Sequence, residues 1–247
     1  MRRLLGPVFV WPAVVGLAAA AGWAARRWGF GVHHVERERQ HVPEGPPMPV
    51  QADPDVRTPD DGVGALFHRR YHVDIAGATA SPEEVIAAVA DDFNAFSPTE
   101  IAHFERVTGE GPLAVGDDLL VHIASPWNGP VRVAEITPTS LTLATREGHL
   151  ESGTICFSAA RHPTDDARLR FTIESWARSS DALVDVVYDT LGVAKGVQGA
   201  MWEFFCTRVA EAFGEPASDV EVLTEREATP EEQAKDAKAK DETGGEA

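Results

Sequence analysis

Two side chains near the middle of the sequence have the types and spacing used in acid–base chemistry. His149 and Glu151 lie two residues apart, beside glycines and at the entrance of an expected strand, so both can point the same way. An imidazole and a carboxylate placed together can move protons on a bound carbonyl compound. The alternative is a hydrogen-bonded turn that stabilises a hairpin, which we favour because so short a motif is weakly specific.

Glu174 is a second carboxylate candidate. It alternates with Phe171 and Ile173 in an expected strand, which places it on the solvent side. A β-bulge that turned it inward would make it a candidate base. The nine histidines include no HxH or HExxH pattern, so no metal site is expected. No P-loop or GxGxxG sequence is present either, so no cofactor is expected.

Aromatic side chains from separate parts of the chain are the candidates for a ligand-binding wall. Small-molecule pockets combine apolar walls with few polar groups. Ordinary core packing is the alternative, and it must account for at least half of the set. The candidates are Phe104, Trp127, Trp176, Tyr188, Trp202 and Phe205.

The elements expected to position these residues begin with a strand over 67–75, where apolar and polar residues alternate. A helix is expected to begin at Ser81, because Ser at the cap, Pro at the first position and Glu at the third favour a helix start. A second short helix is expected soon after Ser97.

From Gly116 onward the period changes to two, which predicts five antiparallel strands joined by short links. Asn128 and Gly129 predict a tight hairpin turn, because both residue types accept positive φ. One long helix is expected from Ala182 to Phe213, with an apolar stripe and several internal glycines.

This order of elements, together with residues 126–130 (PWNGP), 144–153 (ATREGHLESG) and 174–179 (ESWARS), resembles the START-like superfamily of polyketide cyclases and lipid-transport domains, also called SRPBCC. The segments look like a bacterial branch of unknown function within it. The resemblance implies an α+β helix-grip fold, with a curved antiparallel sheet around a long C-terminal helix. It also implies a habit of ligand binding, but no particular reaction.

The N-terminal segment predicts a membrane anchor. Leu4–Ala25 carries no charge and is long enough to span a bilayer, with arginines on both sides. A cleaved signal peptide is the alternative. The distribution of arginines favours a cytoplasmic body. The expected division is a transmembrane anchor over 1–30, a Pro-rich linker over 31–64, a START-like domain over 65–213 and an acidic disordered tail over 214–247.

The net charge of −17 makes nucleic acid an improbable partner, because an acidic body repels phosphate backbones. The leading hypothesis is a membrane-anchored, non-enzymatic domain that binds a small hydrophobic or lipid-like ligand. One alternative is a cyclase- or hydrolase-type enzyme that uses His149 with Glu151 or Glu174. The other is a membrane-tethered interaction module whose acidic tail recruits a basic partner.

Overall fold

The structure is a computed structural model, and one large sheet forms most of the part that it describes. The described residues are 33–39, 41–43, 45, 54–100, 102–123, 128–181, 193–216, 218–229, 232 and 234. The strands join in the order β1-β11-β3-β9-β8-β7-β6-β5-β4, with β10 paired to β3 and β2 paired to β7. Their bounds are β1 His33–Arg39, β2 Val56–Arg57, β3 Val63–Ala76, β4 Ala102–Arg106, β5 Asp118–Ile123, β6 Asn128–Thr137, β7 Ser140–Arg146, β8 Glu151–His162, β9 Asp165–Ser179, β10 Glu215–Pro216 and β11 Glu221–Glu227.

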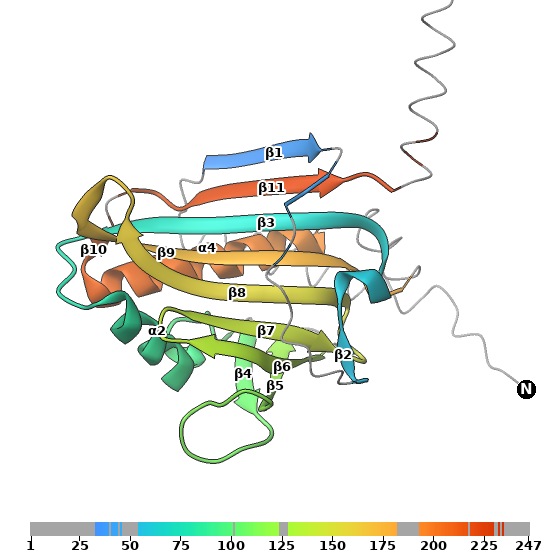
Figure 1. The fold of residues 1–247 in the computed structure, drawn as a ribbon, viewed down its shortest axis with the longest axis horizontal. Helices are drawn as coiled ribbons and strands as arrows, with labels where there is room; N and C mark the ends of the chain where they lie inside the picture. Colours follow the sequence, from blue (N-terminus) through green and yellow to red (C-terminus); the bar gives the residue numbers. More distant parts are fainter. Residues whose placement is uncertain are drawn as a thin grey trace, which may run out of the picture.

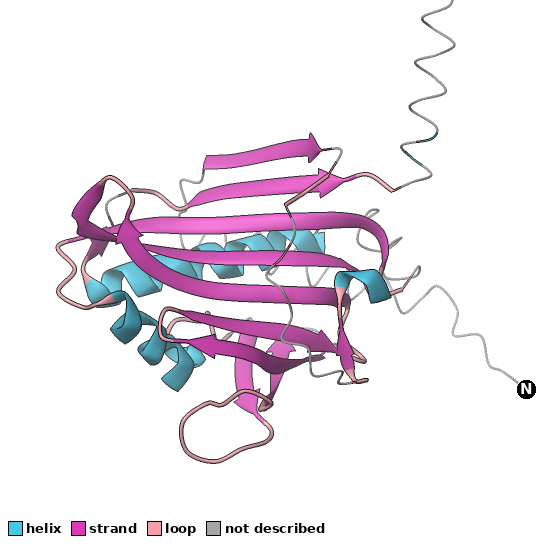
Figure 2. Ribbon diagram, in the orientation of Figure 1, coloured by secondary structure: helices cyan, strands magenta, loops and turns pink. Residues whose placement is uncertain are grey.

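The predicted meander is confirmed, since β5 to β9 follow one another in antiparallel register. β3 continues the sheet beside β9. Figures 1 and 2 show the sheet curving over helix α4 (Val193–Phe213), which lies along one face beneath β3 and β9. A curved, mostly antiparallel sheet against a long C-terminal helix fits the expected helix-grip fold. The first part of the predicted long helix, residues 182–192, lies outside the described residues.

Local signals before the meander predicted two elements correctly. β3 contains the predicted strand, and α2 (Pro82–Asp91) begins after Ser81. The Ser81 side chain accepts a hydrogen bond from Glu84 N, while the Glu84 carboxylate accepts one from Ser81 N, which is a reciprocal cap. The short helix expected after Ser97 is wrong. A 3₁₀ turn, η3 (Phe93–Ala95), precedes Ser97, and β4 follows it.

The hairpin turn predicted at Asn128 and Gly129 is also wrong. Both residues belong to β6, where they pair with His122 and Val121, and the φ angle of Gly129 is not positive. Gly129 is needed for another reason. A Cβ atom there would lie 2.8 Å from two ring atoms of His149, so that ring occupies the space of a side chain.

The acidic segment after residue 214 differs from the predicted disordered tail. β10 and β11 pair with β3, and β1, from the predicted linker, pairs in parallel with β11. A second short 3₁₀ turn in that linker, η2 (Pro59–Asp61), precedes β3. Acidic residues of β11 have partners within the fold: the buried Glu225 contacts Arg39 and His68. Ion pairing and burial therefore order a segment whose composition indicated disorder.

None of the helices in the described part of the chain is long and apolar enough to cross a bilayer. Leu4–Ala25 lies outside that part, so the membrane anchor stays a prediction.

An aromatic core fills the inner face of the sheet near α2. Phe205 of α4 has no exposed surface and lies at the centre of this core. Its ring is surrounded by those of Phe93, Phe96, Phe157, Phe171 and Trp202. The closed end of the space between sheet and helix is therefore occupied by the protein's own side chains.

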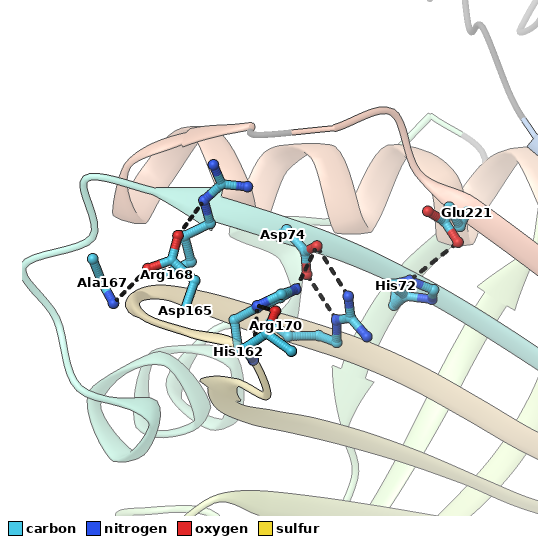
Figure 3. A network of polar contacts seen from close by, with 9 residues as sticks. His72, Asp74, His162, Asp165, Ala167, Arg168, Arg170 and Glu221 are labelled. Atoms are coloured by element: carbon cyan, nitrogen blue, oxygen red, sulfur yellow. Dashed lines mark hydrogen bonds and ion pairs between the residues drawn. The ribbon is translucent and has the colours of Figure 1, made fainter.

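The opposite, outer face of β3 and β9 carries paired charges. In Figure 3, Asp74 lies between Arg170 and His162. Its carboxylate accepts two hydrogen bonds from Arg170, at 2.7 and 3.0 Å, and contacts His162 Nε2 at 3.3 Å. The hydrogen bonds from Arg170 hold the pKa of Asp74 below its ordinary value of 3.8.

We expect Asp74→Asn to lower the free energy of unfolding by about 1–3 kcal/mol at neutral pH. A carboxyl group whose folded pKa is depressed stabilises the protein above its unfolded pKa, and this contribution is lost as the pH falls through the folded value. The difference between wild type and variant should therefore shrink below about pH 4. Denaturant unfolding between pH 3 and 7 measures it, with the exposed Asp165→Asn as a control that should change little.

Candidate functional site

Alternate residues of β3, β8 and β9 form the inner face of the sheet, which α4 covers. Near α2 this face is closed, since Ile75, Phe157 and Phe171 have no exposed surface. Toward the other end of the same strands, Phe67 and Ile155 are only partly buried, and polar side chains join them. The inner face thus changes along the strands from packed core to a partly open polar region. We call its polar members Arg69, Tyr71, His149 and Glu151, together with Glu203 of α4, the inner polar cluster.

Arg69 and Glu151 form an ion pair that is largely removed from water. Arg69 Nη1 lies 3.4 Å from Glu151 Oε1, and the two side chains are 8% and 12% exposed. The Arg69 guanidinium also lies over the Phe67 ring, 4.8 Å from its centroid. Either charge alone would be poorly compensated in this environment, so each requires the other.

His149 holds the turn between β7 and β8 from the inside. The backbone N–H of Glu151 donates to His149 Nδ1 at 2.9 Å. The backbone N–H of His149 donates to Arg146 O at 3.0 Å. Nδ1 also lies 3.0 Å from Glu151 O, so both backbone polar groups of Glu151 are within hydrogen-bond distance of this nitrogen. Burial lowers the pKa of His149, against the opposing effect of the nearby Glu151 carboxylate. The ring therefore fixes the turn through Nδ1, and burial favours its neutral form.

The same ring lies on the inner face. The Cβ position of Gly129 faces both the His149 ring and the Cβ of Val121, a buried core residue. Glu151 is inward as well, because it reaches Arg69. The structure therefore places both members of the predicted acid–base pair on the face that the chemistry requires, while the imidazole Nδ1 is occupied by the hairpin.

Tyr71 and Glu203 add polar groups from β3 and α4. Burial raises the pKa of the Tyr71 phenol, and the charges of Arg69, Glu203 and Glu151 all act on it. The phenol therefore stays protonated and keeps its O–H as a donor.

Glu203 is a half-buried carboxylate on α4. Burial raises its pKa, and no described cation offsets this effect. Its Oε1 lies 3.9 Å from the Cβ position of Gly199, one helical turn earlier. Apart from the helix backbone, no other described atom comes within 4 Å of that position. The carboxylate therefore borders space that the described side chains leave unfilled.

Two of the predicted site residues lie on the outer face instead. Glu174 contacts His68 Nε2 at 2.9 Å, on the side of β9 away from α4. Trp176 stacks on His68 with ring centroids 4.8 Å apart, and its Nε1–H donates to Pro43 O at 3.0 Å. The structure separates both from the inner polar cluster, because no bulge re-aims this part of β9.

The remaining aromatic candidates divide into two groups. Phe104, Trp202 and Phe205 belong to the aromatic core, where Phe104 stacks on Phe93 at a centroid distance of 4.9 Å. Trp127 and Tyr188 lie outside the described residues. The inner polar cluster thus shares none of its members with the predicted aromatic wall.

Arg69, Tyr71 and Glu203 were not among the predicted site residues, although the sequence contains a signal for two of them. Arg69 interrupts an otherwise apolar strand face that includes Phe67 and Tyr71. Glu203 directly follows Trp202, a buried residue of α4. A charged residue at the margin of an apolar face either snorkels to water or marks a polar site.

The described residues contain no candidate metal centre. Within the described ranges, no group of three or more His, Cys, Asp or Glu side chains is arranged to hold a metal ion. The inner polar cluster is instead suited to hydrogen bonding, to charge pairing and to proton transfer.

Comparisons with known proteins give structural similarity alone. No protein-family model matches the sequence, and no curated protein matches it. A norcoclaurine synthase mutant from Thalictrum flavum is similar over 61% of this chain and 98% of its own, with 13% identity and a TM-score of 0.43. A protein from Thermobifida fusca is similar over 60% and 96%, with 13% identity and a TM-score of 0.41. A hypothetical protein from Helicobacter pylori matches over 53% and 83%, with 12% identity and a TM-score of 0.36. At these values the similarity carries no conclusion about ligand or reaction.

Proposed function

We propose that this domain binds a small, largely apolar molecule between the inner face of the sheet and α4, at the end that carries the inner polar cluster. The observation that supports the proposal is that Phe67 and Ile155, on the face that α4 covers, are only partly buried. Apolar walls with a few polar groups that fix orientation are typical of small-molecule sites. The START-like resemblance supports the same habit of binding. The predicted anchor would keep such a site close to lipid, and alkaline extraction of the full chain from membranes tests that part separately.

Filling the proposed space tests the proposal. Ile155→Trp places a large ring on the inner face, whereas Ala160→Trp places the same ring on an exposed position of the same strand. We expect native mass spectrometry of the full chain to show a co-purified small hydrophobic molecule in wild type and Ala160→Trp. Its occupancy should fall at least about tenfold in Ile155→Trp, because the added ring occupies the site. Equal occupancy in the two tryptophan variants would contradict the proposed location.

An acid–base enzyme is the second candidate, because His149 and Glu151 both face inward. Such an enzyme would exchange hydrogens next to a ketone carbonyl in a bound compound. Proton NMR of a small ketone in D₂O, with and without the protein, distinguishes the candidates. Exchange that is abolished by Glu151→Gln would favour the enzyme, and exchange at the uncatalysed rate would favour simple binding.

A further inference from the structure

We propose that His68, when it is protonated, clamps β11 to the rest of the sheet, so that this edge of the sheet is held in a pH-dependent way. The His68 clamp consists of His68 of β3, Glu225 of β11 and Glu174 of β9. Figure 1 shows β11 between β1 and β3, near one edge of the sheet. The clamp lies on the outer face, so it is independent of the proposed ligand site.

Both ring nitrogens of His68 face a carboxylate. Nδ1 lies 3.0 Å from Glu225 Oε2, and Nε2 lies 2.9 Å from Glu174 Oε1. Because β11 and β9 are the two neighbours of β3, the ring connects three adjacent strands. A neutral imidazole has one N–H, whereas an imidazolium has two. With both carboxylates ionised, only the protonated ring can donate to each of them.

The centre of the clamp is shielded from water. The His68 and Glu225 side chains are each 2% exposed. The indole ring of Trp176 stacks on the imidazole at a centroid distance of 4.8 Å. Water cannot replace a hydrogen bond that is lost in this position, so the charge on His68 strongly affects how well the buried Glu225 carboxylate is accommodated.

Glu225 is ionised, and its other partner does not hold it to β3. Burial would raise the pKa of Glu225, but the hydrogen bond from His68 and the charge of Arg39 hold it below its ordinary value of 4.5. Arg39 contacts Glu225 from β1, and β1 takes its strand pairing from β11. Arg39 therefore moves with β11, and His68 is the charge that joins Glu225 to the body of the sheet.

Loss of the proton from His68 breaks one of its two contacts, because one ring nitrogen then presents a lone pair to a carboxylate oxygen. Glu174 is 28% exposed and lies 4.0 Å from Arg70, so it can turn toward water. Glu225 has no such access. In either arrangement the attraction between the His68 charge and Glu225 disappears, and the attachment of β11 weakens as the pH rises.

The other histidines that contact β11 do not give the same response. His72 lies 3.4 Å from Glu221, but burial and the charge of Arg170 lower the pKa of His72. A histidine whose folded pKa is depressed destabilises the fold as the pH falls, which is opposite to the effect of the clamp. His41 contacts Glu227 at 3.6 Å, but it is exposed, so solvent screens this pair.

Hydrogen exchange of the full chain, followed by mass spectrometry, tests the clamp. The exchange is measured at pH 5.5 and 9.0, on either side of the ordinary histidine pKa of about 6.5. We expect the protection factors of β11, corrected for the intrinsic rate at each pH, to fall about tenfold between these values. Those of β7, in the middle of the sheet, should change less than about twofold.

Two variants separate the charge of His68 from a purely structural role. Glu225→Gln should give β11 the same protection at both pH values, because the Gln amide can donate to a neutral ring. His72→Asn removes the other β3 histidine that contacts β11, and it should retain the fall seen in wild type. Protection of β7 within about twofold of wild type at pH 5.5 shows that each variant is folded.

Several results would overturn the inference. These are a wild-type β11 whose protection does not fall, an equal fall in β7 and β11, or a fall that survives in Glu225→Gln. His68→Gln provides a second test, because this side chain cannot be protonated. It should give β11 low protection at both pH values, and wild-type protection of β11 in this variant at pH 5.5 would exclude the clamp.

Discussion

Replacing Phe205 with alanine is expected to lower the free energy of unfolding of the full chain by about 3–5 kcal/mol. The Phe205 side chain is fully buried, and its ring centroid lies between 5.5 and 6.4 Å from five aromatic neighbours. Those neighbours come from α4, from β8 and β9, and from the η3 region, so they cannot move together to close the cavity. The cost therefore includes both the lost burial and the void that remains. Denaturant unfolding of wild type and variant measures the difference.

Phe213→Ala provides the matched control for this prediction. Phe213 is half-buried at the end of the same helix, and its ring lies 6.3 Å from that of Phe96. Its removal should cost no more than about 1–2 kcal/mol, because less surface is buried there. The comparison also decides the role of Phe205. If Phe205→Ala left stability unchanged and weakened ligand binding, Phe205 would belong to the ligand wall rather than to the core.

The elements that the sequence predicted well are those specified by neighbouring residues. Apolar and polar residues alternate over β5 to β9 because successive residues of one strand point to opposite faces of the sheet. The short links between these strands favour an antiparallel meander. The start of α2 is encoded within four residues by Ser81 and Glu84. The stripe of α4 similarly follows from spacing along a single helix.

The failed predictions depend on residues that are distant in the sequence. Asn128 and Gly129 favour a turn locally, but packing against the His149 ring explains the glycine within a strand. β11 is acidic, yet Glu225 is buried because His68 and Arg39, each more than 150 residues earlier, approach it. The composition shows that burying such charges is unfavourable. It does not show which distant residues will form ion pairs with them.

The candidate site could be predicted only in part for the same reason. The pair His149 and Glu151 was visible as a local motif, and the structure places both on the inner face. Glu203 lies on α4, 52 positions after Glu151, so no local motif links the two. Arg69 could be recognised as a charge on an apolar strand face, but its partner could not.

Ending the chain after Gly214 is expected to leave little folded protein, because β11 would be lost. Val220 and Val222 belong to the buried core, and the burial of each contributes roughly 1.5–3 kcal/mol. Their loss alone amounts to much of the roughly 5–15 kcal/mol that stabilises a typical domain. The truncation would also remove the partner strand of β1 and expose the edge of β3, which favours aggregation.

A chain that ends after Ala234 is the control, because it keeps β11 and the contacts of Glu232 with Thr229 and Arg226. We expect it to unfold at a denaturant concentration close to that of the full chain, while the chain that ends after Gly214 is insoluble or lacks a cooperative transition. The contrast follows from the position of β11 between β1 and β3, where both edges of the strand are hydrogen-bonded to a neighbour. Equal stability of the two truncated chains would mean that the acidic segment is dispensable, as its composition suggests. A loss confined to the shorter chain would show that the sheet, and with it the Glu225 contacts to His68 and Arg39, depends on this strand.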